Sequence, residues 1–139
     1  MRLLARVITT TTLTGIAALH AAWATGSAFP FATREELADT VVGSPEFPGA
    51  NACWTVTALA GTGALLVAVQ PRTALVRLAH RGVAATLLAR AIIGGRTSTQ
   101  LLGLPEPSRA FLDADKKIYR PLCLTLGVGA WVSASPARQ

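Results

Sequence analysis

The stretch Ala52–Val69, ACWTVTALAGTGALLVAV, contains no charged residue and decides the fold class of this chain. The apolar core of a bilayer is about 30 Å thick and a helix rises about 1.5 Å per residue, so a run of this length nearly crosses it. The apolar residues are continuous rather than alternating, which argues against a strand of a membrane barrel. The stretch therefore predicts a transmembrane helix.

Three further apolar stretches occur at Leu3–Ala24, Leu75–Gly95 and Leu122–Ser135. Only 14% of the 139 residues are charged and 51% are hydrophobic, whereas a soluble domain carries about 25% charged residues. Because lipid offers no hydrogen-bond partners, the spans must be helical. We therefore expect an all-α polytopic membrane protein, an antiparallel bundle of four transmembrane helices in one domain over residues 1–139. The expected spans are about 3–25, 52–70, 75–95 and 121–135, with loops at 26–51 and 96–120.

The N-terminal stretch also fits a secretory signal peptide. Arg2 and Arg6 precede an apolar run, and Ala22-Trp23-Ala24 resembles a cleavage site. The run is longer than the usual core of about 7–15 residues. We therefore favour a retained first span, with cleavage as the alternative.

The distribution of basic residues predicts an orientation. Arg2 and Arg6 precede the first span, the loop after it is acidic, and Arg72, Arg77 and Arg81 cluster at the turn after the second. These features place both termini in the cytoplasm of a multi-pass cell-membrane protein. The net charge of +6 is spread over loop ends without a nucleic-acid motif, so the expected partners are the lipid bilayer and a protein partner or second copy, not nucleic acid.

Both long loops carry local signals. Thr33-Arg34-Glu35-Glu36 has the pattern of a capping box, which predicts a short amphipathic helix over 35–42. Pro121 is expected in the first turn of the fourth helix, where proline costs least.

Several blocks along the chain resemble the bacterial membrane proteins of domain-of-unknown-function family 3995. The residues that carry the resemblance are Leu19–Ala24, Gly26-Ser27, Phe29–Phe31, Asn51–Trp54, Leu88–Ala91, Asp115, Tyr119–Leu124 and Gly127. The chain departs from the family pattern at Arg120, where serine is expected, and at Gly94-Gly95, where an acidic or aromatic residue is expected. The resemblance implies a four-helix membrane protein of about this length and implies no activity.

Polar and reactive residues of four different spans fall at a similar depth, near the expected outer ends. These candidate site residues are His20, Trp23, Cys53, Trp54, Arg90, Asp115, Tyr119 and Cys123. An arginine inside a span needs a partner or access to water. We expect Arg90 to pair with a carboxylate of the second long loop, Asp115 before Asp113, with snorkelling to the head groups as the alternative.

The other candidates have plainer explanations. His20 suits a hydrogen-bonded packing histidine better than a metal or haem ligand, because no cluster of further ligands accompanies it. Cys53 and Cys123 could form a disulfide or a redox pair, but buried free cysteines are the favoured interpretation. Trp23, Trp54 and Tyr119 fit an aromatic belt at the outer interface.

Three classes of function remain open from the sequence. The leading class is a non-enzymatic membrane bundle that binds a partner or lipid. The second is a small transporter or channel-like subunit that uses Arg90. The third is an outer-face redox or lipid-modifying enzyme that uses His20 and Cys53 with Cys123. We expect no catalytic constellation, metal or cofactor.

Overall fold

The computed structural model describes residues 1–101 and 103–135, and over these residues the chain is all-α without a strand. The elements are α1 (Arg2–Ala24), α2 (Arg34–Val41), α3 (Ala50–Ala68), α4 (Ala74–Ile92), α5 (Arg96–Leu101), α6 (Arg109–Ala114), the π-helical turn η1 (Asp115–Tyr119) and α7 (Arg120–Ser133). The four long helices, α1, α3, α4 and α7, coincide closely with the four apolar stretches. The all-α prediction is therefore confirmed.

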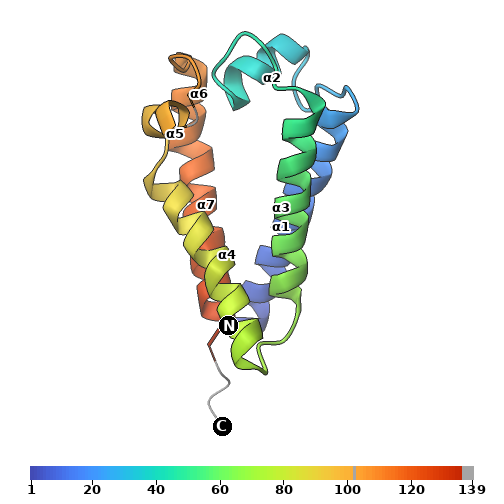
Figure 1. The fold of residues 1–139 in the computed structure, drawn as a ribbon, viewed down its shortest axis with the longest axis vertical. Coiled ribbons are helices and arrows are strands. Elements are labelled where there is room, and N and C mark those ends of the chain that lie inside the picture. The colour runs from blue at the N-terminus through green and yellow to red at the C-terminus, as the bar shows by residue number, and fades with distance from the viewer. Residues whose placement is uncertain (102, 136–139) are drawn as a thin grey trace.

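The four long helices form two pairs that lie in a V (Figure 1). One arm consists of α1 and α3, and the other of α4 and α7. The arms meet at the end that holds the N-terminus, the α3–α4 turn and the end of α7, which we call the vertex. They separate toward the end that holds α2, α5 and α6, which we call the open end.

Small residues let the helices approach closely toward the vertex. A Cβ atom on Gly127 would lie 2.8 Å from Cγ of Leu88 on α4, and one on Gly129 would collide with the hydroxyl of Thr9 on α1. Alanine, leucine and valine side chains from all four long helices fill the core there. The buried members are Leu13, Ala64, Val67, Ala84, Leu126 and Ala130.

His80 joins the two arms at the α3–α4 turn. It is completely buried, and its Nδ1 and Nε2 lie 2.8 Å and 3.2 Å from the carbonyl oxygens of Val76 and Val67. The Val67 carbonyl belongs to the last turn of α3, where no helical amide remains to bind it. Carbonyl oxygens only accept and a neutral imidazole carries one N–H, so His80 donates to one of the two, and the tautomer with hydrogen on Nε2 ties α4 to the end of α3. The short turn predicted around Pro71 is present between Ala68 and Ala74.

The second long loop is much more helical than the sequence suggested. The segment expected as a loop over 96–120 contains α5, α6 and η1, and α6, η1 and α7 follow one another without a break. Ser108 caps α6 by accepting a hydrogen bond from the amide of Phe111 at 3.1 Å. Pro121 lies in the first turn of α7, as predicted, but this turn continues an existing helix rather than starting one.

Two of the helices, α1 and α3, are long and apolar enough to cross a membrane. The helix α4 contains three arginines and α7 has 14 residues, so neither meets the same criteria. The composition of the observed helices thus supports two spans of the four that the sequence predicted.

Candidate functional site

A cavity of about 350 Å³ lies between the two arms near the open end. Most of its lining is apolar or aromatic. The lining residues are His20, Trp23, Val41, Val42, Phe47, Pro48, Ala52, Cys53, Val56, Arg90, Ser98, Thr99, Leu104 and Phe111. Ligand sites in proteins are typically cavities of about 300–1,000 Å³ with mostly apolar walls and a few polar groups. The cavity meets this description, and Arg90 is its one strong charge.

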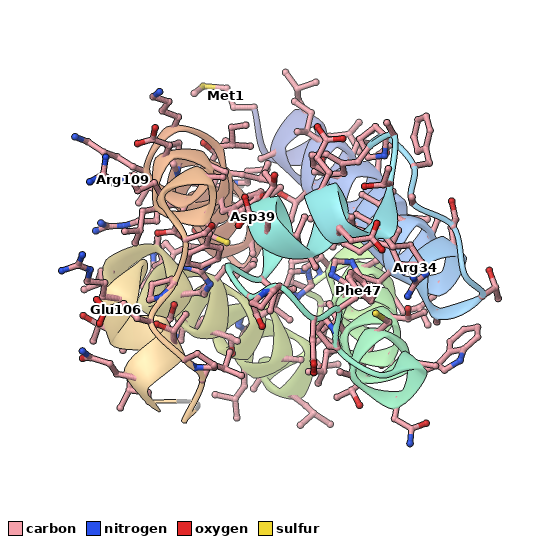
Figure 2. The ribbon with its side chains drawn as sticks, turned by 90° about the horizontal axis from the view of Figure 1, so that it is seen from above. Met1, Arg34, Asp39, Phe47, Glu106 and Arg109 are labelled. Carbon is pink, nitrogen blue, oxygen red and sulfur yellow. The ribbon has the colours of Figure 1, made fainter. Side chains whose placement is uncertain are left out.

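Helix α2 crosses the open end above the cavity (Figure 2). It begins as predicted, because the hydroxyl of its N-cap Thr33 accepts a hydrogen bond from the amide of Glu36 at 3.2 Å. On its buried side, Leu37 packs against Trp23 and Cys53 of the α1/α3 arm.

The C-terminal end of α2 is bound to the other arm. The hydroxyl of Ser108 donates to the carbonyl of Asp39 at 2.8 Å, and the hydroxyl of Tyr119 donates to that of Thr40 at 3.2 Å. The amide of Ser108 donates to the carbonyl of Gly43 at 3.1 Å. Because α2 contacts both arms, it fixes their separation and covers the cavity.

Arg90 and Asp115 form an ion pair beside the cavity, as predicted from the sequence. Nη2 of Arg90 lies 2.6 Å from Oδ1 of Asp115, and the two side chains are 34% and 2% exposed. Within the described part of the chain, Nη1 of Arg90 is shielded from water and has no hydrogen-bond partner. Asp113 instead lies 4.0 Å from Lys117 in an exposed pair.

Asp115 owes its position to the π-helical turn. The amide of Arg120 donates to the carbonyl of Asp115, five residues earlier, so the turn is wider than an α-helical turn. Pro121 follows at once and has no amide hydrogen to donate. Single π-helical turns within helices are frequent at functional sites, and this turn begins at the buried carboxylate of Asp115.

The side chain of Arg120 lies across the C-terminal end of α4. Its Nε donates to the carbonyl of Ala91 at 2.8 Å, which satisfies one of the carbonyls left free at a helix end. A Cβ atom on Gly94 would lie 2.5 Å from Cδ of Arg120 and 2.6 Å from Oδ2 of Asp115. Position 94 therefore has no room for a side chain while Arg120 and Asp115 occupy these places.

His20 contributes one ring nitrogen to the site. Its Nδ1 lies 2.9 Å from the carbonyl oxygen of Ile16, which can only accept, so Nδ1 carries the hydrogen. The ring packs against Trp23 with a centroid distance of 4.6 Å. Nε2 is therefore the ring atom that remains for a ligand, and the prediction of a hydrogen-bonded packing histidine is confirmed.

The structure separates the two cysteines, both of which are free. Cys53 lies on α3 in the wall of the cavity, whereas Cys123 lies on α7 and does not line it. The alternative of a disulfide or redox pair between them is therefore wrong. The physical reason is the V: α3 and α7 belong to different arms, and the arms diverge toward this end (Figure 1).

The aromatic-belt interpretation stays a prediction for Trp54 but is wrong for Trp23. Trp54 is 47% exposed and does not line the cavity, whereas Trp23 is 5% exposed and its indole nitrogen donates to the carbonyl of Phe29 at 2.6 Å. Tyr119 is half-buried against Phe111. Its hydroxyl donates to the carbonyl of Thr40 in α2.

The cavity thus brings together four of the eight candidates, namely His20, Trp23, Cys53 and Arg90, with Asp115 behind Arg90. The cavity walls outside the four long helices were not predicted; they include Phe47, Ser98, Thr99 and Phe111. Phe47 follows α2 in a proline-containing segment, and Phe111 follows the cap Ser108. The aromatic residues of the two long loops were the feature of the sequence from which these walls could have been predicted.

No group of three or more His, Cys, Asp or Glu side chains that could hold a metal ion occurs over residues 1–101 and 103–135. The polar chemistry of the cavity is therefore that of Arg90, His20 and the hydroxyls of Ser98 and Thr99. Both hydroxyls donate to helix carbonyls, of Gly95 and Arg96, and keep lone pairs for a further donor.

The family model described as Protein of unknown function (DUF3995) matches residues 13–130. The chain belongs to the DUF3995 family. The match extends from the middle of α1 to Ala130 on α7, so α3, α4 and all residues that line the cavity lie within the DUF3995 region. The resemblance found in the sequence is therefore confirmed. No curated protein and no solved structure matches the chain.

Proposed function

We propose that this DUF3995 protein is a four-span membrane protein that binds a lipid-soluble ligand in the cavity between its arms. The observation that carries the proposal is the position of the cavity. An apolar space of about 350 Å³ lies between arms whose outer faces are themselves apolar. A site of this composition, within a protein whose outer faces are apolar, suits a ligand that is dissolved in the bilayer.

The exposed faces of the long helices support the membrane location. Large apolar side chains are exposed on all four helices, among them Leu3, Leu4, Leu59, Leu65, Leu75, Leu78, Leu124 and Val128. Only 17% of the apolar window of α1 and 22% of that of α3 are buried. The core helix of a soluble protein would be mostly buried, and exposed apolar surface of this extent indicates contact with lipid or protein.

The charges of α4 and α7 lie where a membrane span tolerates them. Arg77 and Arg81 lie in the first turns of α4, near the vertex, and Arg81 packs 5.6 Å from the ring centre of Trp131. Long arginine side chains at such positions reach the head groups. Arg90 is neutralised by Asp115. The helix α7 is short, but η1 extends it without interruption.

The proposed topology has both termini and the α3–α4 turn in the cytoplasm and α2 outside. The start of α1, the α3–α4 turn and the end of α7 lie at one end of the molecule and α2 at the other, which supports this assignment (Figure 1). Reporter fusions after residues 45, 72, 110 and 139 test the orientation. We expect external signals at 45 and 110 and cytoplasmic signals at 72 and 139. The reverse pattern would overturn the orientation, and an external signal at 139 alone would overturn the number of spans.

The packing favours ligand binding over conduction. Below the cavity, Leu13, Ala64 and Leu126 pack into one cluster, and Val67, Ala84 and Ala130 into another. These clusters involve all four long helices and fill the space between them below the cavity with apolar side chains. The alternative of a redox or lipid-modifying enzyme relied on Cys53 together with Cys123. It is less well supported because Cys123 does not line the cavity.

Photolabelling with an apolar probe tests the cavity. The full chain in lipid vesicles is irradiated with a neutral long-chain alcohol that carries a diazirine, and adducts are mapped by mass spectrometry. We expect labels on Val56 and Leu104, which line the cavity. Ala52→Phe fills the cavity wall and should abolish them, whereas Ala58→Phe, on an exposed position of the same helix, should not. Labels confined to the outer faces would overturn the proposal.

A further inference from the structure

Nε2 of His20 is a hydrogen-bond acceptor that no group of the described residues uses. Nδ1 carries the ring hydrogen because it is bound to the carbonyl of Ile16. A charged imidazolium is disfavoured among apolar walls, so Nε2 bears a lone pair. Over the described residues, the side-chain nitrogen and oxygen atoms that are shielded from water and lack a partner are Oγ1 of Thr10 and Nη1 of Arg90. Nε2 is not one of them and is therefore open to the cavity that His20 lines.

Helix α5 adds two further acceptors to the cavity wall. Oγ of Ser98 and Oγ1 of Thr99 already donate their hydrogens to backbone carbonyls, at 2.8 Å and 2.9 Å, so toward a ligand these hydroxyls can only accept. Arg90 does not reverse this balance, because its Nη2 is bound to Asp115 and its Nη1 is shielded. A ligand that matches these polar groups has to donate a hydrogen bond.

The charges around the cavity favour a neutral donor over an ionic one. No acidic side chain lines the cavity within the described part of the chain, so an ammonium group would lie in an apolar space without a counter-ion. A carboxylate would bring a second negative charge close to Asp115, which already neutralises Arg90. The donor that avoids both costs is a neutral hydroxyl group.

The size of the cavity limits the apolar part of the ligand. An engineered apolar cavity of about 150 Å³ binds benzene, so a cavity of about 350 Å³ has room for roughly a dozen non-hydrogen atoms. This is the volume of one chain and not of the two chains of a diacyl lipid. Val56 and Leu104 line the cavity and are 38% and 40% exposed, so a longer chain can continue past them into the bilayer.

We propose that the ligand is a single-chain lipid alcohol whose hydroxyl group donates a hydrogen bond to Nε2 of His20. The depth of His20 suits this role. His20 precedes the last residue of α1, Ala24, by four positions, which places it about 6 Å below the outer end of the helix. The polar end of an amphiphile also lies near the head groups. This inference rests on the proposed function, that the cavity takes its ligand from the membrane.

Competition against the photolabel tests the hydrogen bond with the unsubstituted protein. The full chain in phosphatidylcholine vesicles is labelled with the diazirine alcohol in the presence of dodecanol or of dodecyl methyl ether, at equal mole fractions in the bilayer. The ether has the same chain and an oxygen atom but no hydrogen to donate. We expect dodecanol to displace the labels on Val56 and Leu104 about tenfold better, which corresponds to one hydrogen bond.

The outcomes of this competition separate the two proposals. Equal displacement by dodecanol and its methyl ether would overturn the hydroxyl donor, while the proposed function would stand. Absence of labels from the cavity of the unsubstituted protein would overturn both. Dodecylamine and dodecanoate extend the series to charged head groups of the same chain length. Better displacement by either of them than by dodecanol would overturn the alcohol and assign the cavity to a charged amphiphile.

Two substitutions of His20 test its part in binding. His20→Phe keeps a ring against Trp23 but has no acceptor, so it should reduce the preference for the alcohol over the ether to near one. His20→Gln places an amide oxygen close to the position of Nε2 and should retain the preference. Circular dichroism shows whether each variant folds. A full preference for the alcohol in folded His20→Phe would overturn the role of Nε2.

Nitrogen NMR of the unsubstituted chain tests the same contact if the variants do not fold. The chain contains two histidines, and His80 is buried at the vertex, away from the cavity, so it serves as an internal control. In a histidine-labelled sample we expect dodecanol to shift the Nε2 signal of His20 upfield and to leave both signals of His80 in place. The methyl ether should shift neither residue. An unchanged His20 signal at saturating dodecanol would overturn the hydrogen bond.

Discussion

The vertex and the open end of the V are built from the same four helices in opposite ways. At the vertex, glycine, alanine and a buried threonine bring α7 against α1 and α4, and the core is continuous. At the open end, α2 and the loops hold the arms apart, and an ion pair and aromatic rings border a cavity. The vertex therefore holds the fold together by close packing. The open end provides the site, and hydrogen bonds and charges replace close packing there.

The largest expected effect is at the ion pair of the open end. Arg90→Ala leaves the buried carboxylate of Asp115 unpaired and should lower the free energy of unfolding in detergent. Breaking a buried pair costs about 3–5 kcal/mol, and we expect a loss near the lower end of that range because Arg90 itself is partly exposed. Asp115→Ala should lower the free energy of unfolding by less than Arg90→Ala does. The double variant should recover part of the loss.

The exposed carboxylate of Asp113 is the matched control for Asp115. Asp113→Ala removes a pair whose side chains are both about 70% exposed and should change stability by about 0–1 kcal/mol. A double variant, Arg90→Ala with Asp115→Ala, that loses the sum of the two single effects would show that the pairing contributes nothing.

Close packing at the vertex predicts the next largest effect. Gly129→Ala places a Cβ atom on the hydroxyl of Thr9 and should destabilise the protein by about 1–3 kcal/mol. Gly15→Ala meets no atom within 4 Å and should be neutral or stabilise by up to about 1 kcal/mol. Thermal unfolding in detergent measures both. Equal effects would contradict the close approach of α7 to α1.

The two histidines provide a second test of the same contrast. His80→Leu removes the buried N–H that donates to the carbonyl of Val67 or of Val76 and should cost about 1–2 kcal/mol. His20→Leu removes a bond within α1 only and should cost less. Urea unfolding of the detergent-solubilised variants ranks them. A larger effect for His20 would mean that the open end, not the vertex, limits stability.

The smallest expected effect is confined to α2. Thr33→Ala removes the N-cap hydrogen bond and should destabilise α2 by about 1 kcal/mol. Hydrogen exchange should speed up in α2 and remain unchanged in α7. Thr86→Ala, which removes an exposed hydroxyl within α4, is the control and should alter neither. Faster exchange in α7 as well would show that α2 also stabilises the vertex.

The sequence predicted the long helices because their signals are local. Apolar runs, the cap at Thr33 and the break at Pro71 each act within a few residues of the chain. The pairing of Arg90 with Asp115 was predictable for a related reason. In an antiparallel bundle the end of one helix and the start of the next lie at the same end of the bundle, and Arg90 and Asp115 lie near two such ends. The expected and observed ends of the four long helices agree because such local signals determine them.

The divergence of the arms could not be predicted from local signals. It depends on α2 contacting both arms, through Leu37 on one side and Ser108 on the other. For the same reason the similar depth of Cys53 and Cys123 in the sequence left a cysteine pair open as the alternative to free cysteines, although their helices belong to different arms. The π-helical turn before Pro121 was missed because a proline there is equally compatible with an ordinary helix start.

The contact of Arg120 with Gly94 has a consequence for how the family can vary. Arginine at 120 and glycine at 94 occupy one volume. The two positions are therefore epistatic: in this arrangement a side chain at 94 and the arginine at 120 exclude each other. Relatives with a bulky residue at 94 should carry a small residue at 120, and the pair should change as a unit along the family tree.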